Sequence, residues 1–265
     1  NNVKQEEGSG KSYTASGTTI TFSEAVASTD SCYLVYMGSA QQTVTAPAGS
    51  IVSGQFSSAD LVLPKTVTVG SAAEEDTKLV FDGNAQDFHI GLDDSEDKLT
   101  IGLGSTLGTT SHMTFDSTGA ILKPLQPAFL VTKNTAQNNL ALDTENTITY
   151  DTERFDQNGD FASNTFTAPV TGRYQLTTMN FMSNIDAQAT YYNLRIRTSN
   201  LDYFGTAYSP SSTDSDPVYW VFSANVLADM DANDTAIVTL YQPNGTAQTD
   251  MGGSHQSFFS GFLAC

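Results

Sequence analysis

Apolar and polar residues alternate strictly in the second half of the chain. Tyr174, Leu176 and Thr178 fall on one face of an extended segment, and Gln175 and Thr177 fall on the other. A period of two residues is typical of a β-strand with one buried face. Helical periodicity nowhere extends beyond about two turns. The pattern therefore predicts an all-β protein.

A series of such strands is expected in the segment 127–265. Asn158-Gly159 and Asn244-Gly245 are typical turn dipeptides between strands. The predicted strands cover 128–132, 146–150, 164–168, 174–183, 191–198, 203–207, 218–226, 235–242 and 257–263.

Two stretches of this segment carry the strongest local signals. T-F-T-A-P-V-T-G-R-Y, at 165–174, reads as a strand, a tight turn and a second strand. Pro169 fixes its own φ, and Gly172 is expected to supply the backbone freedom that the turn needs. F-F-S-G-F-L-A-C, at 258–265, is an aromatic run with an internal glycine, as expected of a buried central strand.

A second series of short strands precedes this segment, at 78–81, 87–92, 98–103, 112–115 and 120–122. The starts recur roughly every ten residues, as in trimeric β shafts. One such chain cannot bury a core of useful size, whereas three chains about a common axis could, with their apolar rows pointing inward. The motif K-P-L-Q-P at 123–127 is expected to form a stiff hinge after this shaft.

The start of the chain is predicted to form a small β module with strands in 13–22 and 32–37. An extended linker is expected to follow, because Pro47 and Pro64 are unsuited to a central strand. The predicted organisation is a β module at 1–45, a linker at 46–75, a β shaft at 76–126 and a head at 127–265.

Four motifs occur in a characteristic order: A-F-L-V near 128, F-T-A-P-V-T-G-R-Y-Q-L near 166, A-N-V-L-A-D-M-D-A-N-D-T-A-I-V-T-L near 224, and F-F-S-G-F-L at the end. In this order they resemble the globular head of complement component 1q, a trimeric jelly roll of the tumour-necrosis-factor type. The resemblance covers roughly 127–265 and implies a jelly-roll head and a homotrimer. The spacing in F-D-Q-N-G-D-F departs from the family pattern, which leaves the early strand boundaries open.

The stretch F-H-I-G-L-D-D-S-E-D-K-L-T-I-G-L-G-S, followed by M-T-F-D-S-T-G-A-I, resembles bacteriophage tail-fibre segments that precede a distal head. This resemblance implies a virion protein that acts in host attachment and contacts other tail proteins through its N-terminal side. The implied receptor is a host surface glycan or an outer-membrane protein. Two alternatives remain open, a purely structural virion appendage and a cellular or secreted complement-like adhesin.

Acidic residues dominate the charge of the chain. Asp and Glu number 29 against 11 Lys and Arg, for a net charge of −18. Such a surface repels nucleic acid and anionic membranes, so both are excluded as expected partners. Because no apolar run reaches the length of about 18 residues that a spanning helix needs, no membrane insertion is expected. The two cysteines, Cys32 and Cys265, are expected to be free thiols.

Candidate chemistry is sparse. The acidic clusters Asp93, Asp94, Glu96 and Asp97, and Asp229, Asp231, Asn233 and Asp234, suit Ca²⁺, but solvated turns are the expected interpretation and no cofactor is predicted. The three histidines lack metal-ligand spacing, and His89 is expected on the shaft surface. Trp220 could stack on a sugar, but burial in the head or at the trimer contact is expected. No motif predicts an enzyme.

Function is expected on the polar loops farthest from the shaft, since binding residues concentrate on loops over a rigid scaffold. These loops are 184–190, 208–217 and 243–256. The predicted receptor-binding residues are Asn184, Asp186, Gln188, Tyr208, Asp214, Asp216, Asn244, Asp250 and His255. The predicted trimer core comprises Phe88, Ile90, Leu92, Leu99, Ile101, Leu103, Phe129, Tyr174, Phe259 and Phe262.

Overall fold

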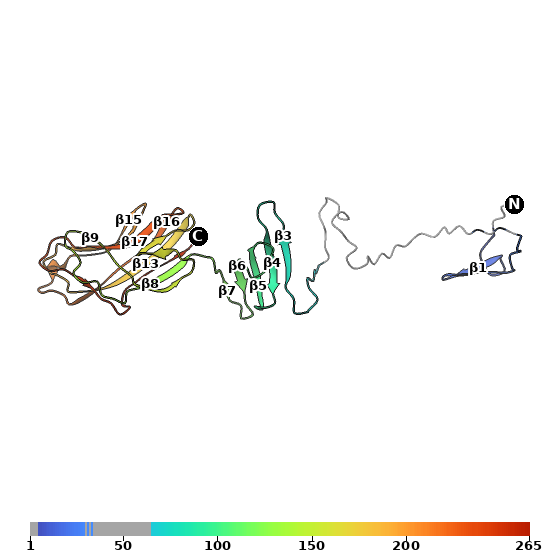
Figure 1. Ribbon diagram of the computed structural model, residues 1–265, viewed down its shortest axis with the longest axis horizontal. Helices are drawn as coiled ribbons and strands as arrows, with labels where there is room; N and C mark the ends of the chain where they lie inside the picture. The colour runs from blue at the N-terminus through green and yellow to red at the C-terminus, as the bar shows by residue number, and fades with distance from the viewer. Residues whose placement is uncertain (1–4, 30, 32, 34–64) are drawn as a thin grey trace. The chain divides into compact units, whose positions relative to one another are not determined.

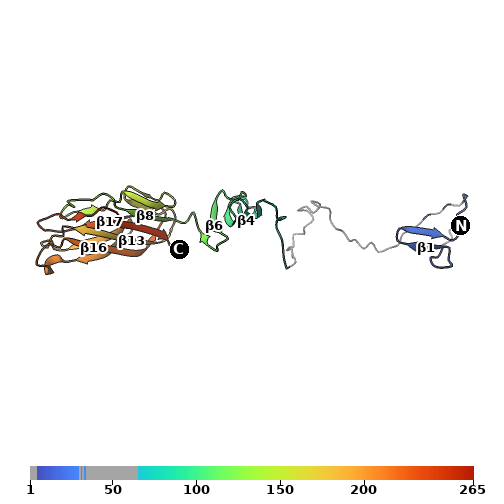
Figure 2. The ribbon, with the colours of Figure 1, turned by 90° about the horizontal axis from the view of Figure 1, so that it is seen from below.

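The computed structural model describes residues 5–29, 31, 33 and 65–265. Its internal contacts divide the chain into two units, Asn1–Thr66 and Val67–Cys265. Regular structure in the described residues is β-strand throughout, apart from one 3₁₀ turn at Pro210–Ser212 (Figures 1 and 2). The prediction of an all-β protein is therefore confirmed. In this part of the chain, no helix has the length and apolarity that a bilayer crossing requires.

The first unit contains one hairpin, formed by β1 (Tyr13–Ser16) and β2 (Thr19–Phe22). Gly17 makes the turn with a φ of 59°, and Tyr13 pairs with Phe22 across the strands. A two-stranded ribbon buries little surface, which agrees with the exposure of most of its side chains. The strand expected at 32–37 lies outside the described residues, apart from position 33.

The second unit begins with a five-stranded antiparallel meander, the shaft sheet. Its strands follow chain order, and each predicted strand is found within one residue at either end. They are β3 (Thr77–Phe81), β4 (Phe88–Asp93), β5 (Lys98–Leu103), β6 (Ser111–Phe115) and β7 (Ile121–Leu122).

One face of the shaft sheet is apolar, and we call it the shaft face. Cross-strand pairing sets Leu79 opposite Ile90, and Ile90 opposite Ile101. Alternation places every second residue of a strand on the same side. The shaft face therefore consists of Leu79, Phe81, Phe88, Ile90, Leu92, Leu99, Ile101, Leu103, Met113 and Phe115.

On the opposite face of the shaft sheet, the loop that joins β5 to β6 covers alternate residues of β4 and β5, which are buried, whereas Val80 of β3 on this face stays 41% exposed. Leu107 of this loop is buried, and it lies so close to Gly91 that an added Cβ there would come within 2.9 Å of Leu107 Cδ2. His89 is fully buried, with its Nδ1 2.8 Å from the carbonyl oxygen of Gly104. The expectation of a surface His89 is therefore wrong, because the loop covers the face that alternation assigned to solvent.

The head contains two six-stranded antiparallel sheets. The first has the order β10-β8-β19-β13-β16, with β18 paired to β13, and the second has the order β11-β12-β17-β14-β15, with β9 paired to β17. The first sheet consists of β8 (Ala128–Thr132), β10 (Thr152–Asp156), β13 (Gly172–Ser183), β16 (Tyr219–Met230), β18 (Asp250–Met251) and β19 (Phe258–Leu263). The second consists of β9 (Glu145–Thr147), β11 (Phe161–Ala162), β12 (Thr165–Thr167), β14 (Tyr192–Thr198), β15 (Asp202–Tyr208) and β17 (Thr235–Tyr241).

The order of the main strands defines the head as a jelly roll. Leaving aside β9, β10, β11 and β18, the chain order of the remaining strands reads 1-8-3-6 in the first sheet and 2-7-4-5 in the second. Such alternation between two sheets is the double Greek key of a jelly roll. The predicted jelly-roll head is confirmed by this pairing.

The head core lies between its two sheets. Tyr174, Leu176 and Met182 of β13 face Leu194 and other buried residues of β14, as the alternation predicted. Aromatic rings fill the end where the chain enters; those of Phe129 and Phe166 stack with centroids 4.8 Å apart.

Three residues predicted for the trimer core belong to this protomer core instead. Phe129, Tyr174 and Phe259 are almost completely buried within the single chain, because they occupy inward positions of the sandwich. Phe262, on the outward side of β19, is half exposed.

Gly172 does not form the predicted turn. It is the first residue of β13, paired with Met230, and its φ is outside the left-handed range. An added Cβ would lie 2.7 Å from Leu263 Cδ1 and 2.9 Å from the carbonyl oxygen of Cys265. The C-terminal residues approach position 172 so closely that they leave no room for a Cβ, and this explains the glycine there.

Candidate binding site at the loop end of the head

The two ends of the head differ in character. The Arg173 N–H donates to the Cys265 carbonyl over 2.7 Å, and the Leu263 N–H donates to the Pro127 carbonyl over 3.0 Å. Chain entry and C-terminus therefore share the end at which β13 begins (Figure 1). The twelve residues of β13 carry the chain about 36 Å to the opposite end, which we call the apex. The segments 184–190, 208–217 and 243–256 are the apex loops.

Hydrogen bonds join the three apex loops at the far end of β13. The N–H groups of Asn184 and Ile185 donate to Val218 and Pro217, both over 3.1 Å. The Thr190 N–H donates to the Pro243 carbonyl over 3.0 Å. The first loop therefore lies between the other two, and the predicted grouping of these loops agrees with the contacts.

Asp186 holds the first and third apex loops together from inside. It is 1% exposed, and its carboxylate accepts the N–H groups of Gln188 and Ala247, each over 2.8 Å, and that of Thr246. Burial raises the pKa of Asp186, but the bonds from Ala247, Gln188 and Thr246 outweigh burial, and the net pKa is lowered. Asp186 therefore positions the loops and does not present its carboxylate at the surface.

Other predicted residues also bond within the apex. Asp250 accepts the Asn184 side-chain amide over 2.7 Å on one oxygen and the Asn139 N–H over 2.7 Å on the other. Asp216 accepts the Ala187 N–H over 2.8 Å, and the Asn244 amide donates to Thr190 Oγ1 over 2.8 Å. Exposed side chains of the apex loops include Gln188, Asp214, Asp216 and Asn244.

A fourth segment, 138–144, belongs to the apex and was missed. The Leu140 N–H donates to the Thr249 carbonyl over 3.0 Å, and Asp143 accepts the Asn244 N–H over 2.8 Å. Asn139 and Asp143 adopt positive φ values of 56° and 53°. The sequence did contain a signal for this loop, namely Asn138-Asn139 and Asp143, since Asn and Asp tolerate left-handed backbone in turns.

Tyr208 and Trp220 form a stacked pair beside the apex loops. Their ring centroids are 4.4 Å apart at an interplanar angle of 17°. The Tyr208 hydroxyl is buried and has no hydrogen-bond partner in the described part of the chain. Trp220 is 39% exposed, so the chain by itself does not provide the burial expected for this side chain.

His255 lies apart from the hydrogen-bonded apex residues. Its N–H donates to the Lys133 carbonyl over 2.7 Å, and its Nδ1 lies 3.1 Å from Thr132 Oγ1 at the end of β8. Lys133 is itself buried and donates to the carbonyl and Oγ1 of Thr149 over 2.8 and 2.7 Å. Burial lowers the pKa of Lys133. This cluster fastens the third apex loop to the side of the sandwich.

The acidic clusters behave as turns. Asp234 accepts the Asp231 N–H over 2.7 Å and the Ser199 hydroxyl over 2.7 Å. Asp93 accepts the Ser95 hydroxyl over 2.8 Å, and Glu96 pairs with Lys98 over 3.0 Å. Within the described ranges, no group of three or more His, Cys, Asp or Glu residues could hold a metal ion.

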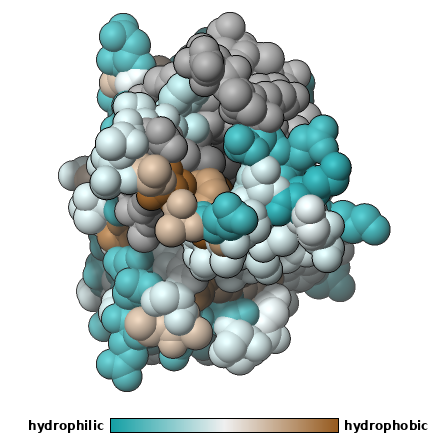
Figure 3. Space-filling view, turned by 90° about the vertical axis from the view of Figure 1, so that its right-hand side faces the viewer, coloured by the Kyte–Doolittle hydropathy of each residue, from teal (hydrophilic) through white to brown (hydrophobic). Residues whose placement is uncertain are grey.

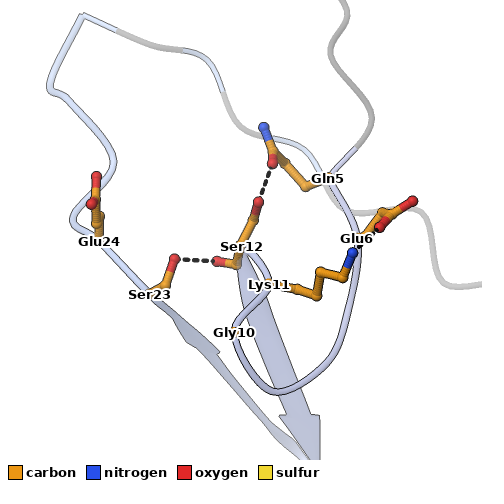
Figure 4. A pocket seen from close by; sticks show the side chains of 7 residues that line it. All are labelled: Gln5, Glu6, Gly10, Lys11, Ser12, Ser23 and Glu24. Atoms are coloured by element: carbon orange, nitrogen blue, oxygen red, sulfur yellow. Dashed lines mark hydrogen bonds and ion pairs between the residues drawn. The ribbon is translucent and has the colours of Figure 1, made fainter.

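The hairpin unit carries an open polar hollow of about 440 Å³ (Figure 4). Lys11 and Glu6 form an ion pair of 2.8 Å at its rim, and Ser23 donates to the Ser12 carbonyl over 3.1 Å. The coloured surface in Figure 3 is mainly hydrophilic, with hydrophobic residues in small patches. The hollow therefore offers a ligand little apolar surface and one cation that is already paired.

The outward face of the first head sheet carries exposed apolar side chains. Tyr219, Val221 and Leu227 of β16 point outward, and Phe262 of β19 and Phe155 of β10 share this side. The rings of Tyr219 and Phe181 contact each other with centroids 5.2 Å apart. Exposed apolar side chains that gather on one face of a sheet are typical of contact sites.

Comparison with known proteins gives matches among solved structures only. No protein-family model matches the chain, and no curated protein matches it. The globular domain of a zebrafish complement 1qA protein is 18% identical and aligns over 53% of this chain and 98% of that domain, with a TM-score of 0.39. Murine APRIL is 9% identical and aligns over 52% of this chain and 98% of its own, with a TM-score of 0.37. The jelly-roll assignment rests on the strand order of the head itself.

Proposed function

We propose that this chain is the distal part of a bacteriophage tail fibre, which forms a homotrimer and binds a host cell-surface receptor through the apex loops. The chain resembles tail-fibre segments in its shaft, and a jelly-roll head follows that shaft. In this proposal the N-terminal side contacts other virion proteins. The receptor is a surface glycan or an outer-membrane protein, and the chain acts by binding without catalysis.

The observation that carries the proposal is the construction of the apex. Loops from three parts of the head meet at the end opposite chain entry, and hydrogen bonds hold them to each other and to Asp186. Binding loses less free energy when the contact surface is ordered beforehand. Gln188, Asp214 and Asn244 are exposed on this ordered base. The apex therefore suits recognition of a polar surface.

Assembly into a trimer is supported by the outward face of the first head sheet. Exposed apolar side chains such as Leu227 and Phe262 would leave water on contact with another copy. Three apices on one particle would also convert weak single contacts into avidity. We infer that the apolar outer face carries the contact and that the apex stays free.

The test is adsorption of the purified full chain to whole bacterial cells and to purified envelope polysaccharide, with and without a chelator. Gln188→Ala, Asp214→Ala and Asn244→Ala are combined in one variant, and Glu153→Ala on β10 is the control. We expect binding by the triple variant to fall at least about tenfold, since few contacts carry most of the binding free energy. Unchanged adsorption by the triple variant would reject the apex as the binding site.

A structural appendage without receptor binding is the second candidate. It is favoured by the engagement of Asp186 and Asp250, whose carboxylates serve internal hydrogen bonds. On this alternative the folded trimer binds no cells of any susceptible host and does not block infection. A cellular or secreted complement-like adhesin is opposed by the tail-fibre resemblance of the shaft.

A further inference from the structure

Three aromatic rings lead from the head core to the surface near the apex. Tyr192 is fully buried, Tyr208 is partly buried, and Trp220 is 39% exposed. Tyr208 joins the other two, with its ring centroid 6.4 Å from that of Tyr192 and 4.4 Å from that of Trp220. The interplanar angles are 24° and 17°, so the rings form a stack that ends at Trp220.

The inner end of this stack is fixed by hydrogen bonds. The Tyr192 hydroxyl accepts the Asp186 N–H over 2.8 Å and lies 2.9 Å from Thr249 Oγ1. The Tyr208 hydroxyl is buried, so Tyr208 supports Trp220 with its ring and offers no hydroxyl at the surface. Trp220 therefore rests on rings that are already ordered, which reduces the entropy lost when a ligand binds.

The exposed ring of Trp220 is separate from the apolar outer face of the first head sheet. Trp220 shares the inward side of β16 with Phe222, which is buried between the sheets, whereas Tyr219 and Val221 point outward. Pairing with Met182 places Trp220 at the apex end of β13. The ring is exposed because it lies at this open end of the sandwich.

We propose that Trp220 is the stacking platform for a pyranose ring of a neutral surface glycan. One face of a hexose carries C–H groups with a slight positive charge, and the π-face of an indole is negative. Tyr208 covers one side of the Trp220 ring, so the sugar contacts the side that Tyr208 leaves open. This site rests on the proposed function, because it names the chemical class of the receptor.

The charge around the platform favours neutral sugars. The loop between Tyr208 and Trp220 contains the exposed Asp214 and Asp216 and no Lys or Arg, in a chain with a net charge of −18. One oxygen of Asp216 accepts the Ala187 N–H over 2.8 Å, which ties this loop to the first apex loop. Carboxylates accept hydrogen bonds from sugar hydroxyls, but they repel the carboxylate of an acidic sugar.

The fluorescence of Trp220 reports on this site directly, because it is the only tryptophan of the chain. The full chain is titrated with methyl glucoside, methyl galactoside, N-acetylglucosamine and neutral oligosaccharides from the envelope polysaccharide of cells that adsorb the chain. Methyl glucuronide is the charged counterpart of methyl glucoside. We expect a saturable change in emission and at least about a twofold fall in acrylamide quenching with a neutral sugar, and a weaker response to the glucuronide.

Substitution separates the platform from the rest of the head. Trp220→Leu removes the ring and Trp220→Phe keeps a smaller one, so adsorption to immobilised envelope polysaccharide replaces fluorescence as the measurement. We expect Trp220→Leu to bind at least about tenfold more weakly than the parent chain, and Trp220→Phe within about threefold. Phe204→Leu is the control, since Phe204 is 66% exposed on β15 with its ring against Arg195. Light scattering and thermal unfolding verify that each variant is assembled and folded.

The results that would overturn the sugar site differ from those that would reject the proposed function. A chain that adsorbs to cells while no sugar changes its emission would overturn the sugar site, and the proposed function would stand with a protein receptor. Acrylamide that fails to quench the sugar-free assembly would also overturn the site, because other copies would then cover Trp220. Equal adsorption by Trp220→Leu and Phe204→Leu would do the same.

The proposed function fails separately if the chain adsorbs to no cells of any susceptible host. In that case an emission response to the neutral glycosides would still support the sugar site.

Discussion

At the residue scale, the apex depends on buried polar groups that hold loops in place. Asp186 accepts three backbone N–H groups from two loops while almost completely buried. Backbone donors at such a site have no water to replace the carboxylate. Asp186 was predicted to contact a receptor, but polarity and a loop position do not distinguish an outward carboxylate from an internal one.

We expect Asp186→Asn to lower the free energy of unfolding by about 2–3 kcal/mol, since hydrogen bonds to a charged group are lost and an amide N–H₂ faces backbone donors. Urea unfolding of the full chain measures the change. Asp214→Asn is the control, because Asp214 is exposed, and its effect should stay within about 0.5 kcal/mol. Equal effects of the two substitutions would contradict the positioning role of Asp186.

Acid is expected to destabilise the head. The pKa of Asp186 is lowered by the bonds described above, and bonds from Thr135 and the Asn134 N–H lower the pKa of Asp151. Unfolding restores an ordinary pKa of about 3.9, so the unfolded chain binds more protons below about pH 4. These carboxylates therefore stabilise the fold above that pH and cease to do so as the pH falls through their folded pKa values.

The thermal midpoint measured between pH 6 and pH 2 tests this linkage. It should fall below about pH 4, and Asp186→Asn should flatten that fall by removing one titrating group. Asp214→Asn should keep the slope of the parent chain. A midpoint that is constant on acidification would contradict the assignment.

At the element scale, alternation and turn residues placed most strands correctly. The predicted 128–132 and 98–103 coincide with β8 and β5. The strands β10, β11 and β18 were missed. β11 and β18 have two residues each, and the register of β10 shifts between Glu153 and Phe155, so none of them shows the sustained alternation that the prediction needs.

The central strand β19 needs a glycine at position 261, because neighbouring side chains pack closely against it. An added Cβ at Gly261 would lie 2.7 Å from Leu176 Cδ2 and 2.8 Å from Phe129 Cε1. We expect Gly261→Ala to destabilise the head by about 1–3 kcal/mol through overpacking. Ser260→Ala, on the outward side of the same strand, is the control and should cost less than about 1 kcal/mol. Thermal or urea unfolding measures the loss of stability in both variants. Equal losses would contradict the overpacking at Gly261.

At the scale of the whole molecule, assembly and binding are expected to fail together. Leu227→Asp combined with Phe262→Asp places charge on the outward face of the first head sheet, so the proposed trimer should dissociate. Avidity is lost with it, and cell binding should fall about 10²-fold or more. Sedimentation measures the mass, and adsorption measures binding. Asn225→Asp is the control, because Asn225 lies on the same face of β16 and is polar already. If the double variant still forms a trimer, this face is not part of the interface.

The sequence by itself determined the all-β class, the succession of strands and the apolar rows of shaft and head. These follow from local alternation and turn chemistry, which act between near neighbours in the chain. Only the tertiary structure decided which face of each strand is covered. The loop around Leu107 buried the His89 side of the shaft sheet, and the second head sheet enclosed Phe129 and Tyr174 within one protomer. Burial depends on distant segments, so a period of two residues identifies the two faces of a strand without saying what packs on either.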